Sequence, residues 1–379
     1  MQYKGDSPLA IYLKEFFKKD SKFGSRDRKT ISSLCYSYYR AGKSFSEIDL
    51  KEKIICAYFL CSTVCNEFIT DLGVEWETNV SKPINDKIDF LLSKSMSISL
   101  NQIFPCPNHL GEGLIQDEIE FIQSHLYQPD LFIRIRPGKM NQVVEKLKKN
   151  GIEYMIENHS LRLPIGTDVA AIFRVDEEVV VQDLSSQKTG SLISKAFSIL
   201  KARGEKPIVW DCCAASGGKS IMAFDIDNNI QLTVTDIRKS IIGKLIERFN
   251  RAGIYKFNHF IQDLTNPLPD ISDFNMIIAD VPCSGSGTWR RTPEEMFFFD
   301  EGTLSEYATK QRAIVQNIVS TMSAGTLFLY ITCSVYKDEN EEVVAHILEN
   351  SDCKLIEQQF INGYHLNADS MYTALFMHP

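Results

Sequence analysis

The chain has 379 residues, of which 44% are hydrophobic and 24% are charged, and its formal net charge is −8. This composition is that of a globular protein, and the length predicts two or three domains of roughly 150 residues each. No stretch reaches the ~18 apolar residues of a membrane helix, and the first residues lack the apolar segment of a signal peptide. We therefore expect a cytoplasmic protein with no membrane partner.

Basic residues are concentrated at the start of the chain. Residues 1–45 contain ten Lys or Arg and four acidic residues, whereas the remainder contains 31 basic and 45 acidic residues. This distribution favours local contact with phosphate groups, although a solvated helix face would have the same composition.

The ten cysteines do not suggest a disulfide framework, since a cytosolic chain of this size keeps its thiols reduced. Cys61 and Cys65 have no histidine or second cysteine pair nearby. We expect them to lie in the core and expect no metal site.

The first third of the chain predicts helices. Apolar residues recur at helical spacing in residues 10–17, 31–39, 51–69 and 115–125, which indicates a helical domain over residues 1–126. The period changes after residue 130. A strand over 131–136, a helix over 141–150 and two strand-like runs within 153–163 predict a small α+β module over residues 127–178.

Strands and helices alternate over residues 179–379, as in a doubly wound, Rossmann-like α/β domain. The predicted strands cover residues 207–210, 231–235, 259–261, 275–279 and 325–331. The predicted helices cover residues 218–226, 238–252, 303–322 and 340–348. Residues 354–360 and 371–377 are expected to close the sheet as a terminal hairpin.

A glycine-rich turn, DCCAASGGK over residues 211–219, overlaps the end of the first of these strands. Gly217 and Gly218 let the backbone approach a ligand, but the chain lacks both common phosphate-binding glycine motifs. Asp236 and Asp263 follow the next two strands, where carboxylates can bind ribose hydroxyls or cap their own loops. This edge fits an adenosine ligand without phosphates, such as S-adenosylmethionine.

Two cysteines lie at strand ends 50 residues apart, in DVPCSG over residues 280–285 and YITCS over residues 330–334. A thiolate that adds to carbon 6 of cytosine makes carbon 5 nucleophilic, and Asp280 could support this addition at ring N3. A single cysteine after a strand is usually buried filler. Cys283 and Cys333 in two polar loops favour a catalytic pair instead.

These motifs resemble, in order and spacing, those of the RNA cytosine-C5 methyltransferases over residues 180–379. The resemblance is carried by residues 182–187, 211–219, 280–287, 290–294, 330–334, 339–341 and 369–374. The α+β module resembles the RNA-binding extension of that family. Residues 25–40 are similar to the NusB-like N-terminal domain of its bacterial small-subunit rRNA members.

The resemblance implies a role for each motif residue. Cys333 would attack carbon 6, Cys283 would assist product release, Asp280 would contact the base and the methyl donor, and Lys219 would lie near the cytosine. Because DNA cytosine methyltransferases attack with a Pro-Cys thiol, the opposite assignment of the two cysteines stays open. The implied cofactor-binding residues are Cys213, Ala214, Ala215, Ser216, Gly217, Gly218, Lys219, Asp236, Asp263 and Asp280.

The chain departs from the family at two positions, with Ser216 where proline is usual and Ile241 where arginine is usual. Serine restores a backbone N–H and loosens φ, so the rigidity of the turn is in question. Arg290 and Arg291 could meet RNA phosphate or form surface ion pairs.

We predict a monomeric, S-adenosylmethionine-dependent RNA (cytosine-C5) methyltransferase that acts on ribosomal RNA. Its target base must be unstacked, and the basic N-terminus and the strand over 131–136 are candidate RNA surfaces. The alternatives are a tRNA cytosine-C5 methyltransferase, a non-catalytic RNA-binding assembly factor and a nicotinamide dehydrogenase.

Overall fold

The structure is a computed structural model, and it describes residues 3–19, 22–45, 47–268 and 274–379. The chain forms two compact units, which are described separately. The helical unit comprises Met1–Leu110, Leu114–Gln128 and Thr288–Glu301, and the sheet unit comprises Gly111–Gly113, Pro129–Gly287 and Gly302–Pro379. No helix of the described residues is long and apolar enough to span a membrane. Those residues also contain no cluster of His, Cys, Asp or Glu that could hold a metal ion.

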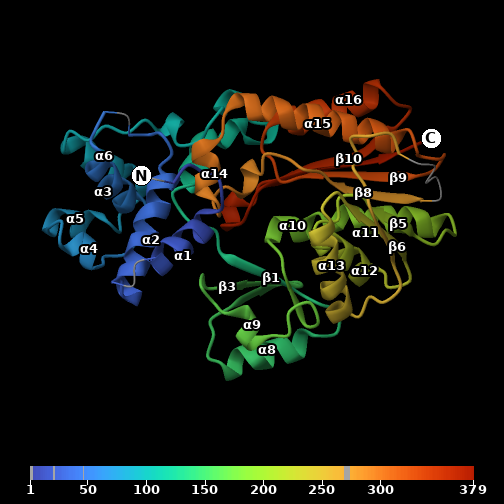
Figure 1. Cartoon of the computed structure of the whole chain (residues 1–379), viewed down its shortest axis with the longest axis horizontal. Helices are drawn as coiled ribbons and strands as arrows, with labels where there is room; N and C mark the ends of the chain where they lie inside the picture. Colours follow the sequence, from blue (N-terminus) through green and yellow to red (C-terminus); the bar gives the residue numbers. More distant parts are fainter. Residues whose placement is uncertain (1–2, 20–21, 46, 269–273) are drawn as a thin grey trace. The chain divides into compact units, whose positions relative to one another are not determined.

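The helical unit is mostly helix, as its periodicity predicts (Figure 1). Its helices are α1 (Leu9–Lys19), α2 (Ser25–Arg40), α3 (Leu50–Cys61), α4 (Glu67–Thr70), α5 (Val74–Asn79), α6 (Ile84–Ser93), α7 (Glu118–Ser124) and α14 (Pro293–Phe298). Short 3₁₀ helices are η1 (Leu100–Gln102), η2 (Pro107–His109) and η3 (Glu112–Asp117), the last of which begins in the sheet unit.

Helix α14 joins this unit from far along the chain. The ring of Phe297 lies 5.6 Å from that of Tyr38 and 5.2 Å from that of Tyr39, between centroids. The backbone N–H of Leu9 donates to Glu294 Oε1 at 2.9 Å. These contacts fix α14 against α1 and α2, because buried aromatic pairs add specific geometry to apolar burial.

A buried lysine caps the C-terminus of α3. Lys87 of α6 donates from Nζ to the carbonyls of Phe59 at 3.4 Å and Leu60 at 3.3 Å, and also to the carbonyl of Ser62. A helix leaves its last carbonyl groups unpaired, and this ammonium satisfies them. The prediction of one amphipathic helical stretch over residues 51–69 is wrong at this point, because α3 ends at Cys61 and α4 begins at Glu67.

Lys87 makes the stability of the helical unit depend on pH. Burial lowers the pKa of Lys87 from 10.5 to about 8. Between these values the unfolded chain binds more protons than the folded one, so the stability of wild type should rise with pH relative to Lys87→Met, by up to roughly 3 kcal/mol. Urea unfolding of both proteins at about pH 7 and about pH 10 measures this difference. A gap between the two proteins that stays constant with pH would contradict the assignment.

The sheet unit contains a small four-stranded antiparallel sheet in the order β2-β3-β1-β4. Its strands are β1 (Leu131–Ile135), β2 (Met155–Glu157), β3 (Ser160–Leu163) and β4 (Val179–Val181), accompanied by α8 (Met140–Lys149) and α9 (Val169–Ile172). Val143 and Leu147 of α8 pack on Ile133 and Ile135 of β1 in one core. The order of β1, α8, β2 and β3 agrees with the predicted elements, whereas the short strand β4 was not predicted.

Strand β1 does not present its arginines to RNA, which corrects the expectation for this strand. Arg134 and Arg136 are only 7% and 9% exposed. Both pair with Asp225 of α12, at 2.5 Å from Arg134 Nη1 and 2.7 Å from Arg136 Nη2. Alternation along a strand puts the two arginines on one face, and that face is covered.

The main sheet has seven strands in the order β10-β11-β9-β8-β5-β6-β7. They are β5 (Ile208–Asp211), β6 (Gln231–Asp236), β7 (Asn258–Ile261), β8 (Met276–Asp280), β9 (Leu327–Thr332), β10 (Lys354–Ile361) and β11 (Met371–Met377). Strands β5 to β9 run parallel, and β10 and β11 form the predicted antiparallel hairpin. The predicted doubly wound α/β fold is confirmed, with the reversal of strand order between β5 and β8.

Helices cover both faces of this sheet (Figure 1). They are α10 (Leu184–Lys188), α11 (Gly190–Ala202), α12 (Gly218–Ile226), α13 (Lys239–Ala252), α15 (Glu301–Val319) and α16 (Glu341–Glu349), with short 3₁₀ helices η4 (Ser286–Thr288), η5 (Lys337–Glu339) and η6 (Tyr364–Leu366). Helices α11, α12 and α13 share one core with Val209 and Leu329, and α15 and α16 share the other with Trp210 and Phe328. Each such buried side chain stabilises the fold by roughly 1.5–3 kcal/mol.

Candidate active site

The glycine-rich turn connects β5 to α12 at the reversal of strand order, where open α/β sheets bind ligands. Gly217 has a φ of +85°, and a Cβ at this position would lie 2.6 Å from Phe249, so only glycine fits. Ala215 also has a positive φ, +46°, and its N–H donates to Asp236 Oδ2 at 3.0 Å. The turn is therefore tied to the end of the neighbouring strand β6.

Asp211, the last residue of β5, lies fully buried under the turn. Its Oδ2 accepts a hydrogen bond from Ser220 Oγ at 2.5 Å, while Oδ1 has no partner among the described residues. Burial raises the pKa of Asp211 to about 7. A buried oxygen without a partner fits a donor group of a ligand. Our prediction of cofactor residues omitted Asp211, although its place directly before the turn was a usable signal.

Asp236 ends β6 with both carboxylate oxygens occupied by protein donors. Besides Ala215, the backbone N–H and the guanidinium of Arg238 donate to it at 2.9–3.0 Å. Burial alone would raise the pKa of Asp236, but the hydrogen bonds and charge of Arg238 outweigh it, and the pKa is lowered. A ribose could reach this carboxylate only after the exposed Arg238 side chain moves.

Asp263 makes its described hydrogen bonds within its own turn. Its Oδ1 accepts from Thr265 N at 3.0 Å and from Thr265 Oγ1 at 2.7 Å. The hydrogen bond from the Thr265 side chain lowers the pKa of Asp263. The register pairs Asp236 of β6 with Ile261 of β7, so Asp263 follows its strand at the same edge of the sheet.

The structure shows how the turn is held at Ser216, where a proline was expected. Arg248 of α13 donates from Nη1 to Ser216 Oγ at 2.8 Å and to the Ser216 carbonyl at 3.0 Å. The same guanidinium donates to the buried Asp176 at 2.7 Å. Arg251 donates to the other oxygen of Asp176 at 2.9 Å. A charge-assisted network thus replaces the rigidity that a proline ring would supply.

This network predicts a specific effect of Arg248→Ala on the turn. Because hydrogen bonds from charged donors contribute about 1.5–3 kcal/mol, we expect the variant to bind S-adenosylmethionine about tenfold more weakly. Isothermal titration of the purified chain measures the affinity. Arg251→Ala is the matched control, since its described contacts reach Asp176 but not Ser216. Equal weakening in both variants would show that Asp176, and not the contact with Ser216, matters.

A second cluster joins α12 to the end of β8. Lys219 Nζ lies 3.0 Å from Asp280 Oδ2 and donates to Ser186 Oγ at 2.9 Å. Lys219 is 7% exposed, whereas the Asp280 side chain is 31% exposed. Lys219 and Asp280, which were predicted separately as site residues, therefore lie together, with a carboxylate that solvent can reach. Ser186 of α10 was missed, although it lies in the segment over residues 182–187 that the resemblance had singled out.

The two cysteine loops also meet. Cys283 Sγ lies 3.3 Å from Cys333 Sγ, and both cysteines are free thiols. The parallel register of β8 and β9 pairs Asp280 with Ile331, so the two loops leave the same edge of the sheet side by side. The hydrogen bond with Cys333 raises the pKa of the Cys283 thiol well above its usual range, and burial raises it further. Cys283 therefore keeps its proton.

Arg290 is not available to phosphate, which corrects the expectation for this residue. Arg290 is 3% exposed, and its Nε donates to the carbonyl of Tyr127 at 3.3 Å. Both residues belong to the helical unit, into which residues 288–301 fold.

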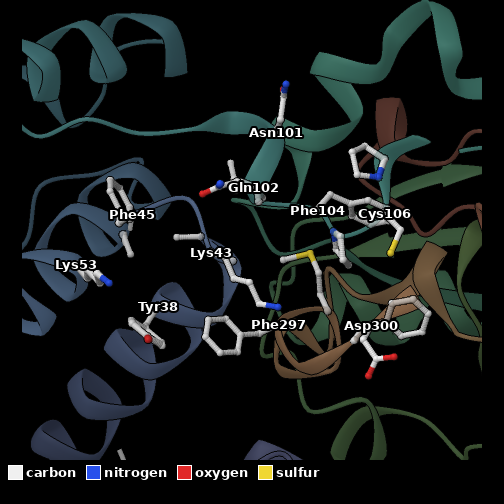
Figure 2. Close-up of a pocket in the computed structure, with 18 of the residues that line it drawn as sticks. Tyr38, Lys43, Phe45, Lys53, Asn101, Gln102, Phe104, Cys106, Phe297 and Asp300 are labelled. Carbon is white, nitrogen blue, oxygen red and sulfur yellow. The ribbon is translucent and has the colours of Figure 1, made fainter. Parts of the chain in front are cut away.

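The helical unit contains a cavity of about 640 Å³. Its lining comes from residues 38–57, 101–107 and 296–301, and none of the predicted site residues contributes to it. Figure 2 shows the Lys43 side chain extending toward the ring of Phe297 in this cavity. Lys43 belongs to the basic N-terminal segment.

Comparison with known proteins agrees with this geometry. Residues 197–378 match the model of a family described as 16S rRNA methyltransferase RsmB/F. These residues include the glycine-rich turn and both cysteine loops. Over these residues the chain is similar to the RsmB/F methyltransferase family.

Individual relatives show how far the similarity extends. The probable ribosomal RNA small subunit methyltransferase B of Bacillus subtilis is 27% identical over 237 residues, 60% of this chain and 51% of that protein. The chain spans about half the length of the first curated relatives that it matches.

Solved structures share the fold. The structure of a protein named PH0851 matches with a TM-score of 0.70 and 18% identity, covering 96% of this chain and 93% of that one. NSun6 from Pyrococcus horikoshii, solved with SFG, matches with a TM-score of 0.56 and 14% identity, covering 66% of this chain and 91% of that one.

Proposed function

We propose that this chain transfers a methyl group from S-adenosylmethionine to carbon 5 of a cytosine in RNA, and that the RNA is ribosomal. The observation that carries the proposal is the pair of free thiols, Cys283 and Cys333, 3.3 Å apart between their sulfur atoms. Asp280 and Lys219 pair at the same sheet edge. The similarity of residues 197–378 to the RsmB/F family supports the RNA substrate.

The cofactor-binding residues would be those of the turn and of the neighbouring strand ends. Asp211 has a buried oxygen without a described partner, which fits the amino group of an amino-acid moiety. The backbone of residues 213–218 and Asp236 lie at the same edge of the sheet. When bound, S-adenosylmethionine supplies an electrophilic methyl group.

The chain's own residues account for the other requirements of the reaction. The Cys333 thiolate adds to carbon 6 of the ring, and its electron pair makes carbon 5 nucleophilic. Once carbon 5 is methylated, a base removes the proton on carbon 5, and the electron pair of that C–H bond re-forms the double bond between carbons 5 and 6. The bond between carbon 6 and sulfur breaks, and its electron pair leaves with the Cys333 sulfur. Cys283, which keeps its proton beside the Cys333 sulfur, is suited to assist this release and not to attack. Asp280 and Lys219 would orient the cytosine ring.

The helical unit would contact RNA through its basic segment, in line with a NusB-like role. Of the ten basic residues between positions 1 and 45, nine are exposed, and Arg40 is buried. Exposed Lys and Arg side chains attract the phosphate groups of RNA, and this electrostatic attraction weakens as the salt concentration rises. Lys43 adds an ammonium group to the cavity of the helical unit.

Bisulfite sequencing of small-subunit rRNA tests the proposal. In a strain that lacks this chain, one defined cytosine should lose its protection from bisulfite conversion. Expression of the wild-type chain should restore that protection, whereas expression of the Cys333→Ala variant should not. In parallel, the purified chain should methylate deproteinised rRNA but not tRNA. Methylation of tRNA alone would favour the tRNA alternative. No methyl transfer to either RNA would favour a non-catalytic assembly factor.

A further inference from the structure

A buried carboxylate, which our prediction of site residues did not include, joins the two cysteine loops. Glu339 of η5 accepts hydrogen bonds at Oε1 from Ser284 N at 2.8 Å and at Oε2 from Ser284 Oγ at 2.5 Å. Its Oε2 also accepts from Ser334 Oγ. Ser284 directly follows Cys283, and Ser334 directly follows Cys333. One fully buried side chain thus holds the residue next to each thiol.

Gln311 of α15 completes the arrangement from the other side. Its Nε2 donates to Glu339 Oε1 at 2.9 Å and to the carbonyl of Pro282 at 3.0 Å. Glu339 therefore has four donors, two on each oxygen, which is the hydrogen-bonding capacity of an ionised carboxylate. The position of the carboxylate is also fixed through its backbone, since Tyr330 donates from its hydroxyl to the Glu339 carbonyl at 2.6 Å.

The network is independent of the sulfur atoms, so it can set their separation. Ser286 Oγ lies 3.1 Å from Ser334 Oγ and accepts from Val335 N at 2.9 Å, which adds a further bond between the loops. Asn340 Nδ2 donates to the Ser334 carbonyl at 3.0 Å. A loop pair held by several satisfied buried hydrogen bonds has one arrangement, because breaking any of them leaves a buried polar group unpaired.

Among the described residues, the titratable groups that interact with Cys283 include Cys333 on the β9 loop, Glu339 on η5 and Tyr330 on β9. Burial raises the pKa of Tyr330 well above its usual range, so this hydroxyl stays neutral. Arg312 of α15, also near Tyr330, is paired with Glu342 at 3.0 Å. Burial raises the pKa of Glu339, although hydrogen bonds from Ser284, Ser334 and Gln311 oppose this shift. When ionised, Glu339 is a negative charge that disfavours a Cys283 thiolate.

We propose that Glu339 is a positioning residue that fixes the separation of the two cysteines and keeps Cys283 as the thiol that carries the proton. The catalytic consequence rests on the proposed function, whereas the effect on the thiol does not. Glu339 contacts no substrate atom and acts only through the two loops.

Two substitutions separate position from charge. Glu339→Ala removes the hydrogen bonds by which Glu339 joins the two cysteine loops. We expect kcat to fall about hundredfold, since misplaced reacting groups reduce rates by that order, and KM for RNA to stay within about threefold of the wild-type value. Glu339→Gln keeps most of these hydrogen bonds, because the hydroxyls of Ser284 and Ser334 can rotate to accept from the amide, but it removes the negative charge. We expect it to retain kcat within about tenfold and to shift Cys283 alkylation to lower pH. Rates of iodoacetamide alkylation, mapped by peptide mass spectrometry against pH, measure the shift.

Controls are available in the same chain. Glu342→Gln removes a surface carboxylate on α16 and should behave as wild type in both assays. The exposed thiol of Cys65 should keep one alkylation profile in all variants. If Glu339→Ala does not fold, Gln311→Ala removes the hydrogen bonds to Glu339 and Pro282 while the carboxylate is still present, and we expect kcat to fall about tenfold.

The outcomes are distinguishable. The proposal would be overturned if the pH dependence of Cys283 alkylation in Glu339→Gln were the same as in wild type. An unchanged kcat in folded Glu339→Ala or Gln311→Ala would also overturn it. A wild-type chain that transfers no methyl group would instead remove the proposed function, and the Cys283 alkylation profile would still decide the role of Glu339.

Discussion

Replacing Cys333 with alanine should abolish methyl transfer while RNA and cofactor binding stay close to those of wild type. In the proposed mechanism the Cys333 thiolate would supply the electron pair that activates carbon 5. The neighbouring Cys283 is a poor substitute, because its raised pKa favours the protonated thiol. Loss of a catalytic nucleophile commonly reduces turnover by several orders of magnitude, so we expect a decrease of at least about 10³-fold. A radiolabelled methyl-transfer assay with saturating rRNA measures it.

The control for this variant is Cys65→Ala, which removes a thiol outside the site; Cys65 is exposed, so the expectation that it lies in the core is wrong. It should retain full activity, and the Cys333 variant should keep its affinity for S-adenosylmethionine in a titration. A Cys333→Ala protein that still turns over would exclude this sulfur as the nucleophile.

Replacing Cys283 with alanine should give a different defect, in which a covalent protein–RNA adduct accumulates. The bond between Cys333 and carbon 6 would form, but the thiol 3.3 Å away that assists its release would be missing. Turnover should fall by at least about 10²-fold, the contribution of a positioned proton-transfer group. A denaturing gel should show a slowly migrating band that ribonuclease removes.

The double variant, Cys283→Ala with Cys333→Ala, is the control because it should form no such band. An adduct in Cys333→Ala, and none in Cys283→Ala, would reverse the roles of the two cysteines. That result would make this site resemble the DNA cytosine methyltransferases, which attack with a Pro-Cys thiol.

Much of the sheet unit follows from short-range patterns. Strands β5 to β11 each coincide with a predicted apolar run, and the turn over residues 211–219 lies where its glycines indicated. Parallel strands place their carboxyl ends at one edge, so the sequence alone indicates that Asp280 and the two cysteine loops meet. This inference needs only the strand boundaries and the order of the elements.

Elements that lack a local signal were missed. Strand β4 has three residues, too few to show alternation, and it forms by pairing with β1. Helix α11 was overlooked although it has a local signal, since Ile193, Ala196, Phe197 and Leu200 recur at helical spacing and lie in one core. The return of residues 288–301 to the helical unit depends on aromatic contacts with α2 more than 200 positions earlier.

The sequence by itself determined which chemical groups the site contains, because turn glycines, strand-end acids and the two thiols are specified by neighbouring residues. Only the tertiary structure decided how those groups are held. Three contacts join residues that are distant in the chain. They are the ion pair of Arg134 with Asp225, the hydrogen bonds of Arg248 with Ser216, and the hydrogen bonds of Glu339 with the two cysteine loops. Such partners are selected by burial and by the cost of leaving a charge unpaired, and neither quantity is encoded in the spacing of residues along one segment.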